Sequence, residues 1–171
     1  IIFGALNEAS IAWSVAKKAH EEGAEFTLTN APIALRLGKI QDLAKECGTI
    51  VIPADVTSVK DIEGLYEKSI EHLGGNIDFI LHSIGMSRNV IKKREYPFLD
   101  YKDFEEAIDV SALSLHKVLS VAYKNDYLNE QASVVTLTYI GSHKMFDTYS
   151  DMSQAKALLE SIVRSFGNHY G

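Results

Sequence analysis

The sequence is poor in cysteine, in basic stripes and in long apolar runs, and each shortage excludes a class of protein. A single cysteine, Cys47, excludes an internal disulfide and a cysteine zinc cluster. No apolar run approaches the roughly 20 residues that span a bilayer, so no membrane partner is expected. A formal charge of -6 without a basic stripe argues against a nucleic-acid partner. We therefore expect a cytoplasmic globular protein.

Length and composition predict one domain over residues 1–171. Hydrophobic residues make up 46% and charged residues 23%, and neither a repeat nor a low-complexity tract interrupts them. The chain opens on Ile1 without an initiator Met and closes at Gly171 just after a predicted helix. These ends indicate a fragment, or a sequence that stops where order stops.

Strand-like and helix-like segments alternate along the chain. Residues 77–82 are apolar at nearly every position, as in a strand buried on both faces of a parallel sheet. Crossover helices between such strands predict an α/β fold, a doubly wound parallel sheet of the Rossmann type with three layers, α/β/α. The predicted strands are 1–3, 25–29, 49–53, 77–82 and 132–138, and the predicted helices are 10–22, 33–47, 59–73, 102–125 and 149–166.

The turn between the first strand and the first helix is a candidate phosphate site. In a doubly wound sheet this turn borders the nucleotide crevice, and the helix start offers free N–H groups. Gly4 permits close approach of a ligand, and Ser10 could cap the helix before Ile11 or donate to a phosphate oxygen. The usual G-x-G-x-x-G fingerprint is absent, and a capped helix after a buried strand is the plain alternative.

The end of the second predicted strand, residues 28–32, contains neither an acid nor an arginine. An acid there would pair with the ribose hydroxyls, and an arginine would accept a 2′-phosphate. Arg36 lies further on, in a predicted helix, where we expect it to point to solvent. Without a phosphate clamp, the sequence favours NADH as cofactor, with NADPH as the alternative.

Tyr149 and Lys156 form the candidate catalytic pair. Seven residues make two helical turns, so both side chains are expected on one face of the helix 149–166. An ammonium group beside the phenol would lower the pKa of the tyrosine, and the lysine could bind ribose hydroxyls. Two amphipathic side chains whose tips reach solvent are the alternative.

Several motifs, in this order, resemble the enoyl-[acyl-carrier-protein] reductase family, a divergent branch of the short-chain dehydrogenase/reductases. Ordinary short-chain reductases carry Tyr-x3-Lys rather than Tyr-x6-Lys, and the similarity runs from Gly4 to about Arg164. Met86-Ser87 departs from the aromatic-then-small pair that is frequent in the family. The motifs are Gly4-Ala5-x4-Ser10-Ile11-Ala12, His82-Ser83-Ile84-Gly85, Ile108-Asp109-Val110-Ser111 with Ser114, Leu137-Thr138-Tyr139, and Tyr149-x6-Lys156 with Met152.

The resemblance implies a set of cofactor-binding residues. Asp55 would accept a hydrogen bond from the adenine amino group, and Val56 would cover the ring; a helix cap is the alternative for Asp55. His82 by itself is expected to be a core histidine rather than a catalyst. The implied cofactor residues are Gly4, Ser10, Ile11, Asp55, Val56, Ser83, Ile84, Gly85 and Lys156.

The same resemblance implies reduction of the trans-2 double bond of an enoyl thioester carried by acyl carrier protein. Tyr149 would bind the thioester oxygen, Lys156 would position the ribose, and Tyr139 would border the substrate or pack at a strand end. Met86 and Met152 would line the substrate site, and no metal is expected. Family members are generally homotetramers, with helices 102–125 and 149–166 as the expected interface. The resemblance also implies that the absent C-terminal part holds a substrate loop and the last strands.

Two rival functions remain open. The first is a ketoacyl-type short-chain reductase, which would use the same sheet and cofactor. The second is a non-catalytic nucleotide-binding protein on a Rossmann scaffold, in which Tyr149 and Lys156 would be idle.

Overall fold

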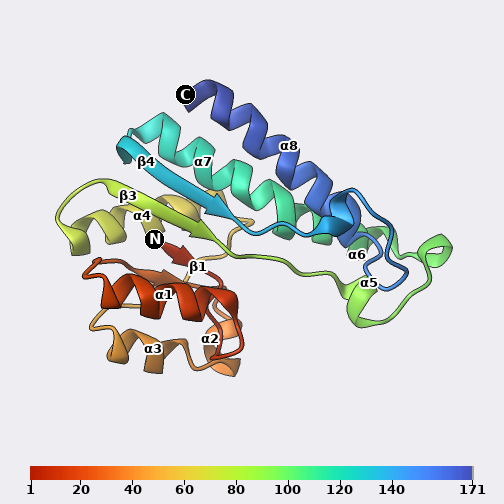
Figure 1. Ribbon diagram of the computed structural model, residues 1–171, viewed down its shortest axis with the longest axis horizontal. Helices are drawn as coiled ribbons and strands as arrows, with labels where there is room; N and C mark the ends of the chain where they lie inside the picture. The colour runs from red at the N-terminus through yellow and green to blue at the C-terminus, as the bar shows by residue number, and fades with distance from the viewer. Residues whose placement is uncertain (171) are drawn as a thin grey trace. The chain divides into compact units, whose positions relative to one another are not determined.

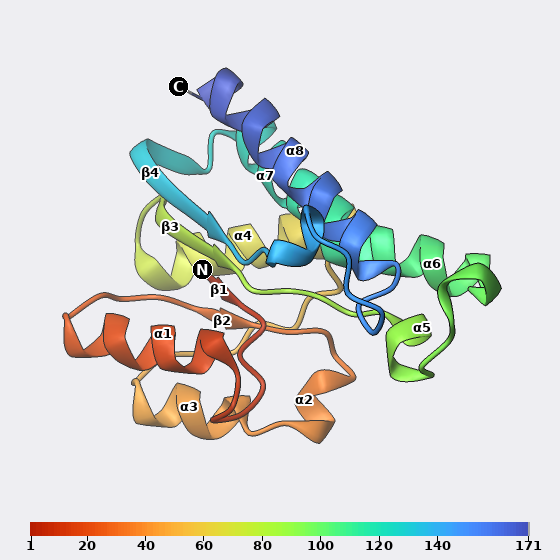
Figure 2. The same cartoon turned by 45° about the vertical axis from the view of Figure 1, so that its right-hand side comes forward.

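The computed structural model describes residues 1–170, with Leu37 described by its backbone alone. The chain divides into two compact units (Figures 1 and 2). The first unit comprises residues 1–83 and 120–136, and the second comprises residues 84–119 and the chain from 137 onward. Helix α7 (Ser114–Asn125) contributes its first half to the second unit and its second half to the first.

A parallel sheet organises the first unit. Its strands are β1 (Ile2–Phe3), β2 (Leu28–Thr29), β3 (Ile77–His82) and β4 (Leu128–Thr136), in the order β2-β1-β3-β4. Ile2 pairs with Leu28 on one side and with Leu81 on the other. All three side chains are buried, which confirms the parallel arrangement predicted from the apolar run at 77–82.

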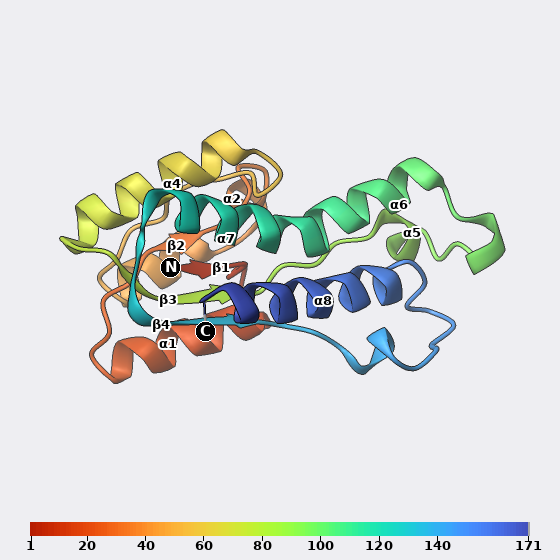
Figure 3. The same cartoon turned by 90° about the horizontal axis from the view of Figure 1, so that it is seen from above.

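Helices flank this sheet on both faces. The helices are α1 (Ile11–Glu21), α2 (Ala34–Leu37), α3 (Ile40–Glu46) and α4 (Val59–Leu73), together with the second half of α7. Helices α1 and α4 lie on opposite faces of the sheet, as Figure 3 shows from above. Helix α1 buries Ala12 and Ala16, whereas α4 buries Ile62 and Leu65, so each presents an apolar face to the unit's core. The three-layer Rossmann-type fold is therefore confirmed.

The largest differences from the predictions in the first unit lie between residues 33 and 53. The single helix expected over 33–47 is wrong, because the chain is extended at Gly38 and the helix divides into α2 and α3. A Cβ atom at Gly38 would lie 2.5 Å from the Leu6 side chain, so the break lets the first turn pack there. The strand expected at 49–53 is reduced to one bridge between Leu28 and Val51, and in the described residues the sheet has four strands.

The second unit is mainly helical. Its elements are α5 (Arg88–Ile91), η1 (Tyr96–Phe98), α6 (Tyr101–Ile108), η2 (Asp109–Leu113), the first half of α7, η3 (Ile140–Ser142) and α8 (Met152–Tyr170). The run predicted as one helix over 102–125 is helical throughout, with a π turn at η2. Its core contains Ala112, Leu115 and Leu119, which pack with Leu159 and Ile162 of α8. Within residues 1–170, no helix combines the length and apolarity needed to cross a bilayer.

Candidate functional site

The turn after β1 approaches the end of β3 so closely that only glycine fits. Gly4 has a φ of 88°, and a Cβ atom there would lie 1.9 Å from the carbonyl oxygen of Ser83. Gly4 also donates its N–H to Thr29 at 3.1 Å. Three of the four strand ends in the first unit therefore converge at Gly4, the turn predicted to bind phosphate.

Ser10 stabilises this turn rather than capping the helix. Its Oγ accepts from the N–H groups of Leu6 and Asn7 at 3.1 and 3.4 Å and donates to the Asn7 carbonyl at 2.6 Å. It makes no side-chain cap bond to α1, so the interpretation of Ser10 as a helix cap is wrong. The start of α1 is left without a side-chain cap, beside the exposed Ile11, and a phosphate group could be accommodated there.

Asp55 and Val56, the residues expected near adenine, differ in exposure. Asp55 is exposed, and its Oδ1 accepts from the N–H and hydroxyl of Thr57 at 2.9 and 2.7 Å. Helix α4 is capped by Ser58, which accepts from the Asp61 N–H, so the alternative of Asp55 as the cap is wrong. Val56 is only 8% exposed and offers little free surface to a ring.

Two polar side chains at strand ends of the first unit are fully buried. His82 contacts Thr136 Oγ1 through Nδ1 at 3.0 Å and lies beside the ring of Phe3, which confirms its prediction as a core histidine. Thr29 ends β2, and its Oγ1 has no hydrogen-bond partner. A buried hydroxyl without a partner is unusual in a protein interior.

Lys156 is almost completely buried in the second unit. Its Nζ donates to the carbonyl oxygens of Leu137 at 2.7 Å and Ile84 at 3.3 Å, and the side chain is 6% exposed. Burial lowers the pKa of this ammonium group from 10.5 to about 8. A Cβ atom at Gly85 would lie 3.7 Å from Nζ and 3.3 Å from Met152, so Gly85 keeps the approach to the amine open.

Tyr149 does not lie on the helix that carries Lys156. Helix α8 begins at Met152, and Tyr149 lies in the preceding turn, where Ser150 has a φ of 49°. This left-handed residue interrupts the helical path, since a non-glycine side chain adopts it only at a cost. The expectation that the two residues share one helix, two turns apart, is therefore wrong.

The expected electrostatic effect on Tyr149 is also wrong. Burial, followed by the nearby Tyr139, raises the pKa of Tyr149 above its ordinary value of 10.0. The two tyrosine rings lie with their centroids 4.7 Å apart at 59°, a tilted aromatic pair. A Cβ atom at Gly141 would lie 2.6 Å from the Tyr149 ring and 2.9 Å from the Tyr139 ring. The phenol is therefore neutral at physiological pH and can donate a hydrogen bond.

The two candidate substrate methionines are joined by one serine. The hydroxyl of Ser111, on the π turn, accepts from Met86 N–H at 3.0 Å and approaches the Met86 carbonyl at 3.1 Å. It also lies 3.6 Å from the sulfur of Met152, which is 7% exposed. The structure thus brings Met86 and Met152 together with Gly85 and Lys156 within the second unit.

Glu160, one turn beyond Lys156 on α8, fixes the segment that contains Tyr139. Its Oε1 accepts from the hydroxyls of Ser142 and Thr138, both at 2.6 Å, and its Oε2 contacts His143 at 2.9 Å. The Ser142 and Thr138 hydroxyls are the main cause of a lowered pKa of Glu160. The carboxylate therefore stays charged and holds this segment against the helix.

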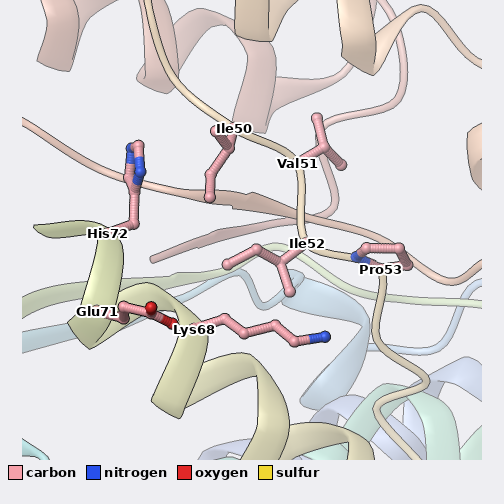
Figure 4. A pocket seen from close by; sticks show the side chains of 7 residues that line it. All are labelled: Ile50, Val51, Ile52, Pro53, Lys68, Glu71 and His72. Carbon is pink, nitrogen blue, oxygen red and sulfur yellow. The ribbon is translucent and has the colours of Figure 1, made fainter.

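The cavities do not all coincide with the predicted residues. One hollow, in the first unit, has a volume of about 510 Å³. Figure 4 shows the side chains that line it, which are Ile50, Val51, Ile52, Pro53, Lys68, Glu71 and His72. It contains no predicted site residue and lies beside the single bridge next to β2. A second hollow of about 600 Å³, in the second unit, is lined by residues 141–147, Ser150 and Tyr96 among others. This hollow borders the turn before α8. Within residues 1–170, no group of three or more His, Cys, Asp or Glu side chains is arranged to hold a metal ion.

Sequence reasoning missed four residues around the candidate pair. Gly141 lies against both tyrosine rings, Ser111 joins the methionines, and Glu160 and Asp151 each fix a loop. Ser111 was visible within the motif Ile108-Asp109-Val110-Ser111, but without an assigned role. The sequence around Glu160 and Asp151 does not indicate their roles, because their hydrogen-bond partners are 18 to 64 residues away in the chain.

A family model and several known proteins match this chain. The model of the family described as enoyl-(acyl carrier protein) reductase matches residues 4–171. An NADH enoyl-[acyl-carrier-protein] reductase of Rickettsia bellii is 35% identical over 173 residues, covering 100% of this chain and 64% of that protein. Enzyme 1 of Rhizobium meliloti, of the same description, is 34% identical over 96% of this chain and 59% of its own length.

A solved structure agrees with these matches. The crystal structure of a FabI–NADH complex from Alistipes finegoldii superposes with a TM-score of 0.97 and is 56% identical in sequence. The match covers 99% of this chain and 60% of that one. The chain thus spans less than two thirds of the length of these relatives. On its sequence, its motifs and its fold, the chain belongs to the enoyl-(acyl carrier protein) reductase family.

Proposed function

We propose that this protein reduces the trans-2 double bond of enoyl thioesters carried by acyl carrier protein, with NADH as reductant. The observation that carries the proposal is the buried Lys156 beside Gly85, which has no side chain to cover the amine, in a unit that also holds two packed tyrosines. Matched relatives are described as NADH enoyl-[acyl-carrier-protein] reductases, which supports the choice of reaction and cofactor.

The first unit fits the nucleotide part of NADH. The turn at Gly4 has no room for a side chain, α1 begins without a side-chain cap, and the Thr29 hydroxyl lacks a partner. We assign the pyrophosphate to the turn of Gly4, Ser10 and Ile11, with the Ile11 N–H at the start of α1 as its donor. The N–H groups of Gly4 and Ser10 already donate to the Thr29 and Asn7 carbonyl oxygens, and the Ser10 hydroxyl donates to Asn7 as well. Asp55 and Val56 are assigned to adenine, and Ser83, Ile84 and Gly85 to the ribose and nicotinamide.

Lys156 is proposed to bind the ribose next to the nicotinamide. With a pKa of about 8, its amine is mainly protonated at neutral pH. Two carbonyl oxygens occupy two of its three donors, which leaves one for a ribose hydroxyl. When bound, NADH supplies the hydride for the β-carbon of the substrate.

Tyr149 is proposed to bind the thioester oxygen. A neutral phenol donates a hydrogen bond to that oxygen as negative charge develops there, an interaction worth about 3 kcal/mol in the transition state. Tyr139 packs on the Tyr149 ring and would border the thioester, and Met86 and Met152 would line the substrate site. The burial that raises the Tyr149 pKa also suits a donor rather than a phenolate.

The test is spectroscopic. NADH and NADPH oxidation at 340 nm is followed with a crotonyl thioester, and in parallel with an acetoacetyl thioester. We expect oxidation of NADH with the crotonyl substrate alone. Oxidation with acetoacetyl thioester instead would favour the ketoacyl-type alternative, and NADH binding without turnover of either would favour a non-catalytic protein.

We also propose a homotetramer that accepts acyl carrier protein. The helices expected at the subunit interface expose apolar side chains, among them Tyr123 on α7 and Val163 on α8. Light scattering coupled to gel filtration tests this assembly, and a monomer at micromolar concentration would contradict it.

A further inference from the structure

Asp151 is a buried acid at the start of the helix that carries Lys156. It is 0% exposed, and it lies between Ser150 and the first residue of α8. Its Oδ1 accepts from the Ser87 hydroxyl at 2.6 Å, and its Oδ2 accepts from the Asn89 amide at 2.8 Å. Both donors are neutral. These two bonds join the start of α8 to the segment of Ser87 and Asn89, which is more than 60 residues away in the chain.

The partners of Asp151 form a rigid support. Ser87 Oγ also accepts from the Val90 N–H at 3.1 Å and thereby caps α5. Asn89 accepts from Arg94 Nη1 at 2.8 Å and from the Asp100 N–H at 3.1 Å, and it donates to the Asp100 carbonyl. All donors and acceptors of the Asn89 side chain are thus satisfied, and its position is determined from several directions.

On its other side, Asp151 adjoins the turn that presents Tyr149. Ser150, between the two, has a φ of 49° and is buried, and its Oγ has no hydrogen-bond partner. A non-glycine residue in this conformation persists only where the surroundings impose it. The Ser150 side chain contributes no such restraint, whereas the carboxylate of the next residue is fixed by two hydrogen bonds.

The position of the Tyr149 ring has little tolerance. The ring packs on Tyr139 and on the Cα of Gly141, where even one added carbon would approach it to 2.6 Å. A hydrogen-bond donor to a developing oxyanion must be placed within a few tenths of an ångström to be effective. The turn before α8 must therefore be held as firmly as the ring.

We propose that Asp151 is a positioning residue that fixes the turn of Tyr149 against Ser87 and Asn89, so that the phenol is aligned before substrate binds. This inference rests on the proposed role of Tyr149 at the thioester oxygen. Asp151 itself touches neither substrate nor cofactor.

The test uses two substitutions, Asp151→Asn and Ser87→Ala. Each is made separately, once in the wild-type chain and once in a Tyr149→Phe background. Asp151→Asn keeps one acceptor oxygen and loses the other, whereas Ser87→Ala removes one donor and leaves the Asn89 contact. Asp109→Asn is the matched control, because it makes the same change to a carboxylate that contacts Lys117 at 2.5 Å within the same unit. The readouts are kcat and KM for NADH and enoyl thioester, and the ζ-carbon NMR signals of the eight tyrosines in labelled protein.

For Asp151→Asn, we expect kcat to fall roughly tenfold with the NADH KM within about twofold, and no further loss in the Tyr149→Phe background. The Tyr149 signal, assigned by its absence in Tyr149→Phe, should shift in Asp151→Asn and in Ser87→Ala but not in Asp109→Asn.

Equal losses of kcat in both backgrounds, or an unmoved Tyr149 signal, would overturn the proposal. If Tyr149→Phe alone left the rate unchanged, the assignment of Tyr149 to the thioester oxygen would be contradicted. The NMR signal of Tyr149 would still show whether Asp151 fixes the position of its ring. Ser87→Ala serves the same purpose if Asp151→Asn does not fold.

Discussion

The candidate nucleotide turn of the first unit and the tyrosine–lysine site of the second differ in the chemical groups that form them. The turn is made largely of backbone: Gly4 approaches Ser83, and the Ser10 hydroxyl is used to hold the N–H groups of Leu6 and Asn7. The second site is made of side chains, with buried Lys156 and Asp151 and the packed rings of Tyr139 and Tyr149.

This difference determines which amino-acid substitutions disrupt each region. A site of backbone N–H groups needs one glycine and a correctly shaped turn, and most side-chain changes around it are tolerated. A site of buried polar side chains needs every partner in place, because each unpaired group carries its full desolvation cost. Substitutions in the first unit should therefore act through shape, and those in the second through hydrogen bonds and charge.

The largest expected effect concerns the side-chain site. Tyr149→Phe removes the donor proposed for the thioester oxygen and keeps the ring that packs on Tyr139. We expect kcat for a crotonyl thioester to fall about 100-fold, equivalent to about 3 kcal/mol, with the NADH KM little changed.

Tyr139→Phe is the matched control for this change, since its ring packs in the same pair. A smaller loss is expected there, because no proton of Tyr139 is assigned to the thioester. An unaltered rate in Tyr149→Phe, measured by stopped-flow at saturating NADH, would remove Tyr149 from the proposed mechanism.

Gly4→Ala should have the largest effect on the backbone-built turn. The new Cβ would overlap the Ser83 carbonyl, and φ at this position is 88°, so both crowding and backbone strain arise. We expect the free energy of unfolding to fall by about 2–3 kcal/mol and NADH binding to be lost.

Denaturant unfolding and calorimetric titration with NADH measure the two effects. Gly64→Ala, on α4, is the control: nothing lies within 4 Å of its added Cβ, and alanine favours the helix. Gly4→Ala protein that bound NADH normally would contradict the assignment of the pyrophosphate to this turn.

The buried charge of Lys156 should appear as a pH dependence of stability. Its pKa is about 8 in the folded protein and ordinarily 10.5, so between these values the unfolded chain binds more protons. Stability from this group therefore rises with pH across that window, and below pH 8 the full cost of the buried ammonium applies.

Comparison with Lys156→Met isolates this contribution. Between pH 7 and 9.5, the wild type should gain about 2 kcal/mol relative to the variant. Urea unfolding at both pH values measures the difference, and parallel curves would show that Lys156 is not desolvated as the structure indicates. NADH affinity of the variant should also fall, as the proposed ribose contact requires.

The smallest expected effect belongs to Ser10→Ala. The change removes the acceptor of the Leu6 and Asn7 N–H groups in a partly exposed turn, and should lower the free energy of unfolding by about 1 kcal/mol. Ser14→Ala, on the exposed side of α1, is the control and should be neutral or slightly stabilising. A loss in Ser10→Ala no larger than in Ser14→Ala would show that the hydroxyl does not hold the turn.

Features with a local cause were predictable from the sequence. The parallel strand at 77–82 and the helix at 59–73 follow from runs of apolar residues, and both are confirmed with their predicted bounds. His82 was also expected to be a core histidine, and it is buried. Gly4 and Gly85 were identified as positions where a ligand could approach the backbone, and both lie in tight surroundings.

Features that depend on distant partners were not predictable. The break at Gly38 follows from the packing of Leu6, more than 30 residues earlier in the chain. The delayed start of α8 follows from the left-handed Ser150, a residue type without a strong preference for that conformation. The raised pKa of Tyr149 follows from burial, which spacing to Lys156 does not reveal.

The sequence alone determined the parallel α/β fold, the family and the residue types of the candidate site. Periodic apolar patterns and ordered motifs depend only on residue types and their spacing along the chain. Tertiary structure alone decided which polar side chains are buried and paired: Asp151 with Ser87 and Asn89, Glu160 with Ser142 and Thr138, and Lys156 with two carbonyl oxygens. The physical reason is that desolvation and hydrogen bonding depend on neighbours in space, and these neighbours are remote in sequence.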